Sequence, residues 1–119
     1  RSAAPAASRR IIIRVDLACG VRIGPGKVAL LEAIARTGSI SGAGRALRMS
    51  YRRAWELVED LNQHVGRPVV STAAGGAGGG GARLTPAGLA IVTEYRALEA
   101  ETAAAAEARL AALEAGLQG

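Results

Sequence analysis

The stretch that decides the fold reads SISGAGRALRMSYRRAWELVEDLNQHV and covers residues 39–65. Its composition predicts a short helix over residues 39–47 and a longer one over residues 50–65. The two helices meet at Leu47-Arg48-Met49. Two helices joined by so short a turn match a helix-turn-helix, in which the second helix presents its first residues to base edges in the major groove of DNA.

Serines stand where both helices would begin. Ser39 or Ser41 can cap the first helix and Ser50 the second, because a serine hydroxyl accepts a hydrogen bond from an otherwise unpaired backbone amide. Gly66, with Pro68 after it, ends the second helix. Apolar residues at helical spacing predict a buried face formed by Ala54, Leu57, Val58, Leu61 and Val65.

The second helix opens with Tyr51 and two adjacent arginines, Arg52 and Arg53. Cations at this position oppose the helix dipole, and a local preference broken in this way often marks a functional site. A phosphate arriving at this end would supply the missing anion. The alternative is an ordinary solvated first turn. Combined with the turn before it and the hairpin after it, the pattern favours contact with DNA by residues 50–53.

On the N-terminal side, residues 1–10 show no periodicity and predict a mobile tail. Residues 11–17 and 21–23 are β-branched and alternating, which predicts a hairpin that turns at residues 18–20. The run Gly24-Pro25-Gly26 should then interrupt the chain. A helix is expected over residues 27–36, ended by Gly38.

On the C-terminal side, residues 68–72 and 82–84 are short strand candidates on either side of AAGGAGGGG. A strand, a loop and a strand after a helix-turn-helix predict a wing, with the glycines as a flexible loop whose backbone amides can approach phosphate. Arg83 stands at the base of this wing. A slack hairpin linker is the alternative, favoured somewhat by the lack of charge from Pro68 to Ala82.

The last predicted helix begins with Thr85 as cap and Pro86 as first residue, and runs to about Glu114. One face carries large apolar residues, and the centre of the helix is rich in Ala, which lets two helices approach closely. We expect this helix to form a homodimer through a stripe that includes Ile91, Tyr95, Leu98, Leu110 and Leu113.

The 119 residues are enough for one domain. Charge is distributed unevenly along them. Residues 1–85 carry 13 basic and five acidic residues, a net charge of +8, while residues 86–119 have a net charge of −3. A basic body indicates a polyanionic partner, although a genome that favours Arg codons would also explain why 14 of the 15 cations are Arg. Cys19 is the only cysteine, and no nucleophile–base pair or phosphate-binding loop is present, so we expect no metal, cofactor or catalysis.

The run GPGKVALLEAIARTGSISGAGRALRMSYRRAWELVEDLNQHVGRPVV, followed by GGAGGGGARLTP, resembles the N-terminal DNA-binding domain of ModE-type molybdate-responsive regulators. That domain is similar to the winged helix-turn-helix of LysR-type regulators. The resemblance covers roughly residues 11–98. It implies a mainly α (α+β) fold: a winged helix-turn-helix with an N-terminal β-hairpin, a Gly-rich β-wing and a long C-terminal dimerisation helix. It also implies base reading or phosphate contact by Ser39, Ser50, Tyr51, Arg52, Arg53 and Arg83, with Trp55 packing the recognition helix onto the body.

Three departures from that family pattern are visible. The chain ends at Gly119, where full-length members continue into molybdate-binding domains, so no molybdate sensor is expected within it. Ala77 stands where the family often has Lys, which predicts one phosphate contact fewer. Arg48 stands where many relatives have Gly or a similarly permissive residue, so we expect either a positive φ at Arg48 or a turn of different shape.

Together these observations predict a tail over residues 1–10, a winged helix-turn-helix over residues 11–85 and a dimerisation helix over residues 86–119. The expected function is a sequence-specific regulator of transcription that binds double-stranded DNA as a homodimer in the cytoplasm, without contact to a membrane. The resemblance implies control of molybdate uptake or other molybdenum-related genes. Two alternatives remain: a winged helix that binds proteins, and the DNA-binding half of a split sensor whose separate effector-binding protein docks on the acidic last helix.

Overall fold

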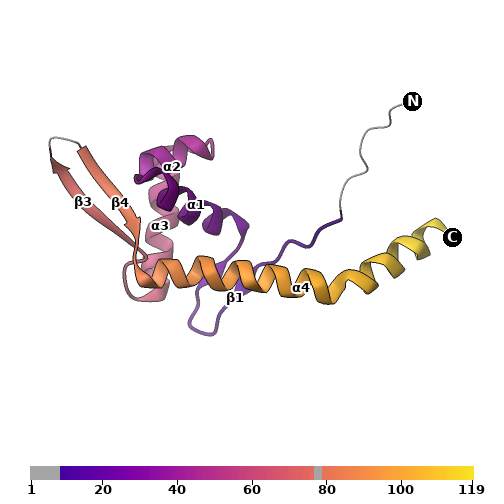
Figure 1. Ribbon diagram of the computed structural model, residues 1–119. Helices are drawn as coiled ribbons and strands as arrows, with labels where there is room; N and C mark the ends of the chain where they lie inside the picture. Colours follow the sequence, from indigo (N-terminus) through magenta and orange to yellow (C-terminus); the bar gives the residue numbers. More distant parts are fainter. Residues whose placement is uncertain (1–8, 77–78) are drawn as a thin grey trace, which may run out of the picture.

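The computed structural model describes residues 9–76 and 79–119, so that most of the predicted tail and the tip of the wing, with Ala77, lie outside it. Three helices form the body, a two-stranded wing projects from one side, and a long helix runs beneath and beyond them (Figure 1). The elements are β1 (Val15–Asp16), β2 (Arg22–Ile23), α1 (Pro25–Thr37), α2 (Ile40–Ala46), α3 (Tyr51–Val65), β3 (Val70–Gly76), β4 (Gly79–Leu84) and α4 (Pro86–Gln118). The predicted winged helix-turn-helix is confirmed.

Helix α1 begins two residues earlier than the sequence predicted. Pro25 is its first residue rather than a break, because the missing amide of a proline at this position would have had no helical partner anyway. Gly38 ends the helix as expected, with a φ of 77° that suits glycine. The backbone amide of Gly38 donates to the carbonyl of Ile34 at 2.8 Å.

The turn between α2 and α3 is tight. Arg48 adopts a φ of 58°, the first of the two alternatives that the family pattern left open. The amide of Met49 donates to the carbonyl of Gly44 at 2.9 Å, and a Cβ on Gly44 would lie 3.2 Å from the carbonyl oxygen of Met49. The close approach of the two helices therefore depends on a residue without a side chain at position 44.

The wing is longer than predicted, because the glycines take part in strand pairing. Its antiparallel ladder runs from the pair Val70 and Leu84 to the pair Ala73 and Gly81, and resumes at Gly76 and Gly79 after an irregularity. The expected flexible loop over residues 73–81 is thus wrong for the described part, since backbone pairing needs no side chain. Two further bonds anchor the wing: the amide of Val69 donates to Asn62 Oδ1, and that of Ala82 to the carbonyl of Gly38, each at 2.8 Å.

The core joins every part of the body. Its buried side chains come from α1, from the inner face of α3, from both hairpins and from α4. Tyr95 of α4 is 2% exposed, and its hydroxyl donates to the carbonyl of Ile13 at 2.7 Å, which ties the N-terminal segment to α4. Arg96 donates twice to Glu32 of α1, at 2.9 and 2.6 Å, and these hydrogen bonds hold the pKa of Glu32 below its usual value.

Helix α4 extends to Gln118, beyond the expected end near Glu114, and its second half projects from the body (Figure 1). Arg9 lies along this half, where it forms ion pairs with Glu107 and Glu114, so the end of the predicted tail contacts α4. Among the residues described, the structure contains no helix with the length and apolarity that crossing a membrane would require.

The start of α4 is held against the wing by a close backbone approach. Thr85 caps the helix by accepting the amide of Gly88 at 3.2 Å, and the amide of Thr85 donates to the carbonyl of Val69 at 3.0 Å. A Cβ on Gly88 would overlap that same carbonyl oxygen. A glycine is therefore required here by packing, although it lies in a helix, where glycine is unfavourable.

We predict that Gly88→Ala destabilises the fold by roughly 1–3 kcal/mol, because the new methyl group must push Val69 or the start of α4 aside. Gly116→Ala is the matched control: it lies in the same helix with nothing near its Cβ position, and should raise stability by up to about 1 kcal/mol. Urea unfolding of both variants measures the difference. Equal effects would show that the close approach is not what fixes residue 88.

Candidate nucleic-acid interface

The first turn of α3 presents three large side chains to the outside. Tyr51 is 56% exposed, and the side chains of Arg52 and Arg53 are 89% and 61% exposed. Each residue is rotated by about 100° from the one before it, so the three point in different directions. Tyr51 lies toward the wing, Arg53 lies toward the start of α1, and Arg52 lies between them.

An acidic residue one turn further along α3 balances part of this charge. Glu56 lies 3.4 Å from Arg52 Nε and 3.6 Å from Arg53 Nη1. The prediction that the arginine pair has no compensating anion within the chain is therefore wrong. Exposed ion pairs of this kind are worth only about 0–1 kcal/mol, so a phosphate can displace Glu56 from either guanidinium.

Tyr51 and Trp55 form an aromatic pair on the wing-facing side of α3. Their rings meet edge to face with centroids 6.3 Å apart, and Trp55 Nε1 donates to the Tyr51 hydroxyl. Trp55 is half-buried and packs against the core, as predicted from the family pattern. The exposed Tyr51 ring is therefore held in one position by a side chain that is itself held by the body.

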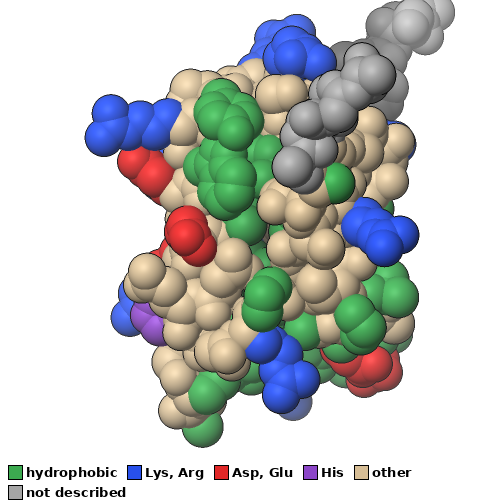
Figure 2. Space-filling view, turned by 90° about the vertical axis from the view of Figure 1, so that its left-hand side faces the viewer, with side chains coloured by type: hydrophobic (Ala, Val, Ile, Leu, Met, Phe, Trp, Pro, Cys, Tyr) green, Lys and Arg blue, Asp and Glu red, His purple; other side chains and the backbone are tan. Residues whose placement is uncertain are grey.

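A cleft of about 380 Å³ separates α3 from the wing. The face that bears the wing carries an apolar patch bordered by charged side chains (Figure 2). The cleft walls combine hydroxyl groups, the aromatic pair and a backbone surface with few side chains: Ser39, Ile40, Ser41, Tyr51, Trp55, Thr72, Ala73, Gly81 and Ala82. A strand of nucleic acid could approach the wing backbone here without obstruction by long side chains.

Two of the predicted site residues, both serines, cap helices. Ser39 Oγ accepts the amide of Gly42 at 2.8 Å, so Ser39 rather than Ser41 caps α2. Ser50 Oγ accepts the amide of Arg53 at 3.0 Å and caps α3. A hydroxyl that accepts in this way can still donate its own proton, so both serines retain one donor for a phosphate.

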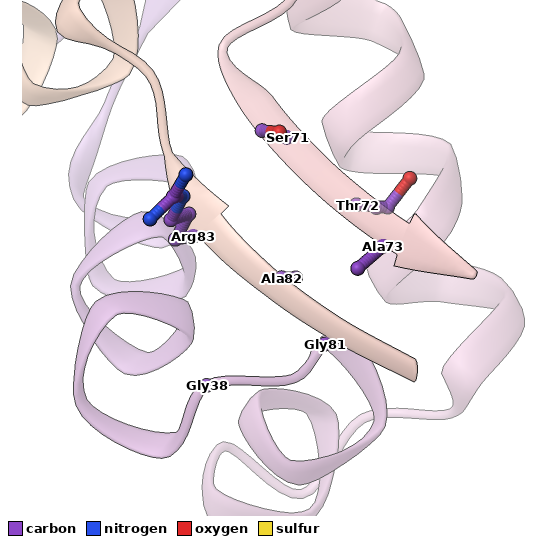
Figure 3. A pocket seen from close by; sticks show the side chains of 7 residues that line it. All are labelled: Gly38, Ser71, Thr72, Ala73, Gly81, Ala82 and Arg83. Atoms are coloured by element: carbon purple, nitrogen blue, oxygen red, sulfur yellow. The ribbon is translucent and has the colours of Figure 1, made fainter. Parts of the chain in front are cut away.

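Arg83 lies apart from the first turn of α3. It stands opposite Ser71 near the base of the wing and lines a second hollow with Gly38 (Figure 3). The structure therefore places Ser39 and Tyr51 at one cleft, Arg83 in the neighbouring hollow and Arg53 on the other flank of α3, with Arg52 between Tyr51 and Arg53. Thr72 was not singled out from the sequence, because its place on the cleft depends on a strand register that alternation alone could not fix.

The predicted dimerisation residues fall into two groups. Tyr95 is buried in the core of its own chain, and Ile91 is partly buried against that core. Leu98 and Leu113 are exposed, and Leu110 is partly so. An apolar groove beside the hairpin adjoins this stripe, with walls that include Leu17, Ile91 and Leu98. Within the described residues, no group of three or more His, Cys, Asp or Glu is placed to hold a metal ion.

The family described as "Bacterial regulatory helix-turn-helix protein, lysR family" matches residues 26–89, more than half of the chain. The chain belongs to this family. The matched region includes the first turn of α4 together with the helix-turn-helix and the wing, and the last two form the cleft. The predicted similarity to LysR-type regulators is confirmed.

Relatives and solved structures agree with this assignment. The chain is 51% identical over 84 residues to the molybdenum-pterin-binding protein MopB of Rhodobacter capsulatus, covering 71% of this chain and 31% of that protein. It is 39% identical over 71 residues to the DNA-binding transcriptional dual regulator ModE of Escherichia coli K12, covering 60% and 27%. It is also similar to full-length LTTR LysG from Corynebacterium glutamicum, with a TM-score of 0.53 and 34% identity over 73% of this chain and 29% of that one. The chain thus spans less than a third of the length of these relatives.

We predict that Ser50→Ala lowers the free energy of unfolding by about 1 kcal/mol, because the amide of Arg53 loses its hydrogen-bond partner. Ser50→Asp should keep the stability, since a carboxylate caps equally well and suits the helix dipole. Urea unfolding tests both. A Ser50→Ala variant as stable as the unchanged protein would mean that the hydroxyl has no capping role.

Proposed function

We propose that this chain binds double-stranded DNA and is the DNA-binding part of a regulator of transcription. The observation that carries the proposal is the first turn of α3, where Tyr51, Arg52 and Arg53 are exposed beside an open cleft and a wing of small residues. Arginine makes two parallel hydrogen bonds to guanine or to phosphate, and Tyr51 offers an apolar ring to a base edge. The net charge of +8 over residues 1–85 supports binding to a polyanion.

We further propose that the regulated genes concern molybdenum. The support is the names of MopB and ModE, relatives that match 71% and 60% of this chain. Binding of the protein to promoters of molybdate-transport genes from its own genome, against unrelated promoters, tests this link. The role requires no catalytic step, and access to chromosomal DNA would place the protein in the cytoplasm.

A homodimer is the second part of this proposal. Leu98 and Leu113 would leave apolar surface in water on the projecting half of α4, and a second copy of the helix would cover it. Two copies would set two α3 helices at successive major grooves, about 34–36 Å apart or at a multiple of that spacing. A single α3 makes too few contacts for tight, specific binding, so the dimer and the DNA site depend on each other.

We predict that log K for DNA falls against log salt with a slope of roughly −5 to −9, as expected if the dimer neutralises about six to ten phosphates. Arg52→Ala or Arg53→Ala should cost about 1–3 kcal/mol of binding free energy and relax the preference at one base pair, if the guanidinium reads guanine. Arg67→Ala, outside the α3 surface, is the control. Fluorescence anisotropy with duplexes of varied sequence measures both quantities, and a slope near zero would exclude DNA as the partner.

We predict that Leu98→Asp together with Leu110→Asp gives monomers, because charges on the stripe prevent its burial between two chains. The monomers should stay folded, since the core uses Tyr95 but neither leucine. Leu89→Asp is the control, exposed on the same helix but off the stripe. Light scattering decides the point: a double variant that remains dimeric, or an unchanged protein that is monomeric at micromolar concentration, contradicts the proposed interface.

A further inference from the structure

The N-terminal hairpin carries a basic outer face that the family description, which begins at residue 26, does not cover. Val15 pairs with Ile23; Ile23 is buried in the core and Val15 is half-buried, while Asp16 and its partner Arg22 are exposed on the opposite face. Arg14 precedes Val15 and is exposed on the same side of the hairpin as Asp16 and Arg22. Its side chain lies 3.3 Å from Asp16 Oδ2, and Arg22 lies 3.8 Å from Asp16 Oδ1. Two arginines therefore share one carboxylate.

A groove of about 450 Å³ connects this hairpin to α3. It runs along the flank of α3 that faces away from the wing, because Arg53 and Leu57 line the groove whereas Tyr51 and Trp55 line the wing cleft. The groove is unobstructed beside Gly26, because a Cβ at that position would have no atom within 4 Å. The full lining is Arg14, Arg22, Gly24, Gly26, Lys27, Met49, Arg53 and Leu57.

One wall of the groove is fixed by an internal ion pair. Lys27 Nζ donates to Asp60 Oδ2 at 2.6 Å and to the carbonyl of Arg22 at 3.0 Å, so the hairpin is tied to both α1 and α3. The hydrogen bond from Lys27 lowers the pKa of Asp60. Lys27 and Asp60 neutralise each other's charge through this ion pair. The positive charge that a ligand in the groove would meet therefore comes from the arginines.

Those arginines belong to two similar arginine–carboxylate units, one on the hairpin and one on α3, and the second reaches the groove through Arg53. Arg14 and Arg22 share Asp16 on the hairpin, and Arg52 and Arg53 share Glu56 on α3. Each unit has one positive charge in excess. The contacts within them are single and 3.3–3.8 Å long, while a guanidinium has five N–H donors, so most donors remain available to a phosphate.

We propose that Arg14 and Arg22 form a second phosphate-binding surface, which holds the DNA backbone on the flank of α3 opposite the wing. This inference rests on the proposed binding of DNA by α3. A helix in the major groove, about 12 Å wide, has a phosphate backbone on each side. The wing faces one of these backbones, and the hairpin lies on the side of the other. Arg53 lines the groove and belongs to the exposed first turn, so the two surfaces are continuous.

The test compares Arg14→Gln/Arg22→Gln with Arg67→Gln/Arg109→Gln, a pair that removes the same charge from outside the groove. In the hairpin variant the salt slope should become less steep by roughly 0.9 for each phosphate that the protein no longer neutralises. The fall in affinity between about 50 and 200 mM salt should then shrink about tenfold for every two such phosphates. The preference for one sequence over another should stay unchanged, because phosphates carry no sequence information.

Two further variants test whether the charge of the hairpin arginines alone sets the binding. Asp16→Asn frees both hairpin arginines and should tighten binding to all duplexes alike, and Arg14→Lys/Arg22→Lys should keep the slope of the unchanged protein. Circular dichroism checks that each variant is folded. The unchanged protein can show a steep salt dependence of DNA binding while the hairpin and control variants have equal salt slopes. In that case the second surface is wrong and the α3 interface stands. If the unchanged protein does not bind duplex DNA, the proposed function itself fails. Salt-sensitive binding of poly-glutamate that needs Arg14 and Arg22, with DNA binding unaffected, would overturn the choice of partner.

Discussion

The backbone of Val69 is the point on which the arrangement of the functional elements depends. Its amide donates to Asn62 on α3, and its carbonyl accepts the amide of Thr85 at the start of α4. Gly88 packs directly against that carbonyl. A single residue thereby fixes the end of α3, the first strand of the wing and the direction of α4. The angle between the wing and α3, and hence the width of the cleft between them, follows from these contacts.

Rigid support of this kind matters because the exposed turn of α3 has little packing of its own. Ser50 caps the helix, Trp55 steadies Tyr51, and Glu56 lies between the two arginines. Each neighbour restricts a side chain without burying it. The arginines therefore stay exposed to solvent, while the helix that carries them is capped at its start, a combination that favours electrostatic encounter followed by a defined docked position.

The parts of the fold that could be predicted from sequence are those with local causes. Helix ends follow from serine caps and from Gly38 and Gly66, and the positive φ of Arg48 follows from the tightness of the turn. The length of the wing could not be predicted, because strand pairing by glycines leaves no side-chain pattern. The burial of Tyr95 and the pairing of Glu56 with two arginines depend on which helix faces are covered, which spacing alone does not decide. The basic groove beside the hairpin is beyond sequence reasoning, since Arg14 and Arg53 are distant in the chain.

The separation of charge along the chain also has a structural consequence. Helix α4 carries two of its acidic residues outward from the body, where Glu107 and Glu114 bind Arg9. These ion pairs offset part of the net charge of −3 that residues 86–119 carry. A helix of 33 residues cannot fold back on the body, so its rigidity keeps the acidic half away from the α3 surface. The stiffness that would hold two bodies at a fixed spacing on DNA thus also keeps Glu107 and Glu114 away from the exposed arginines of α3.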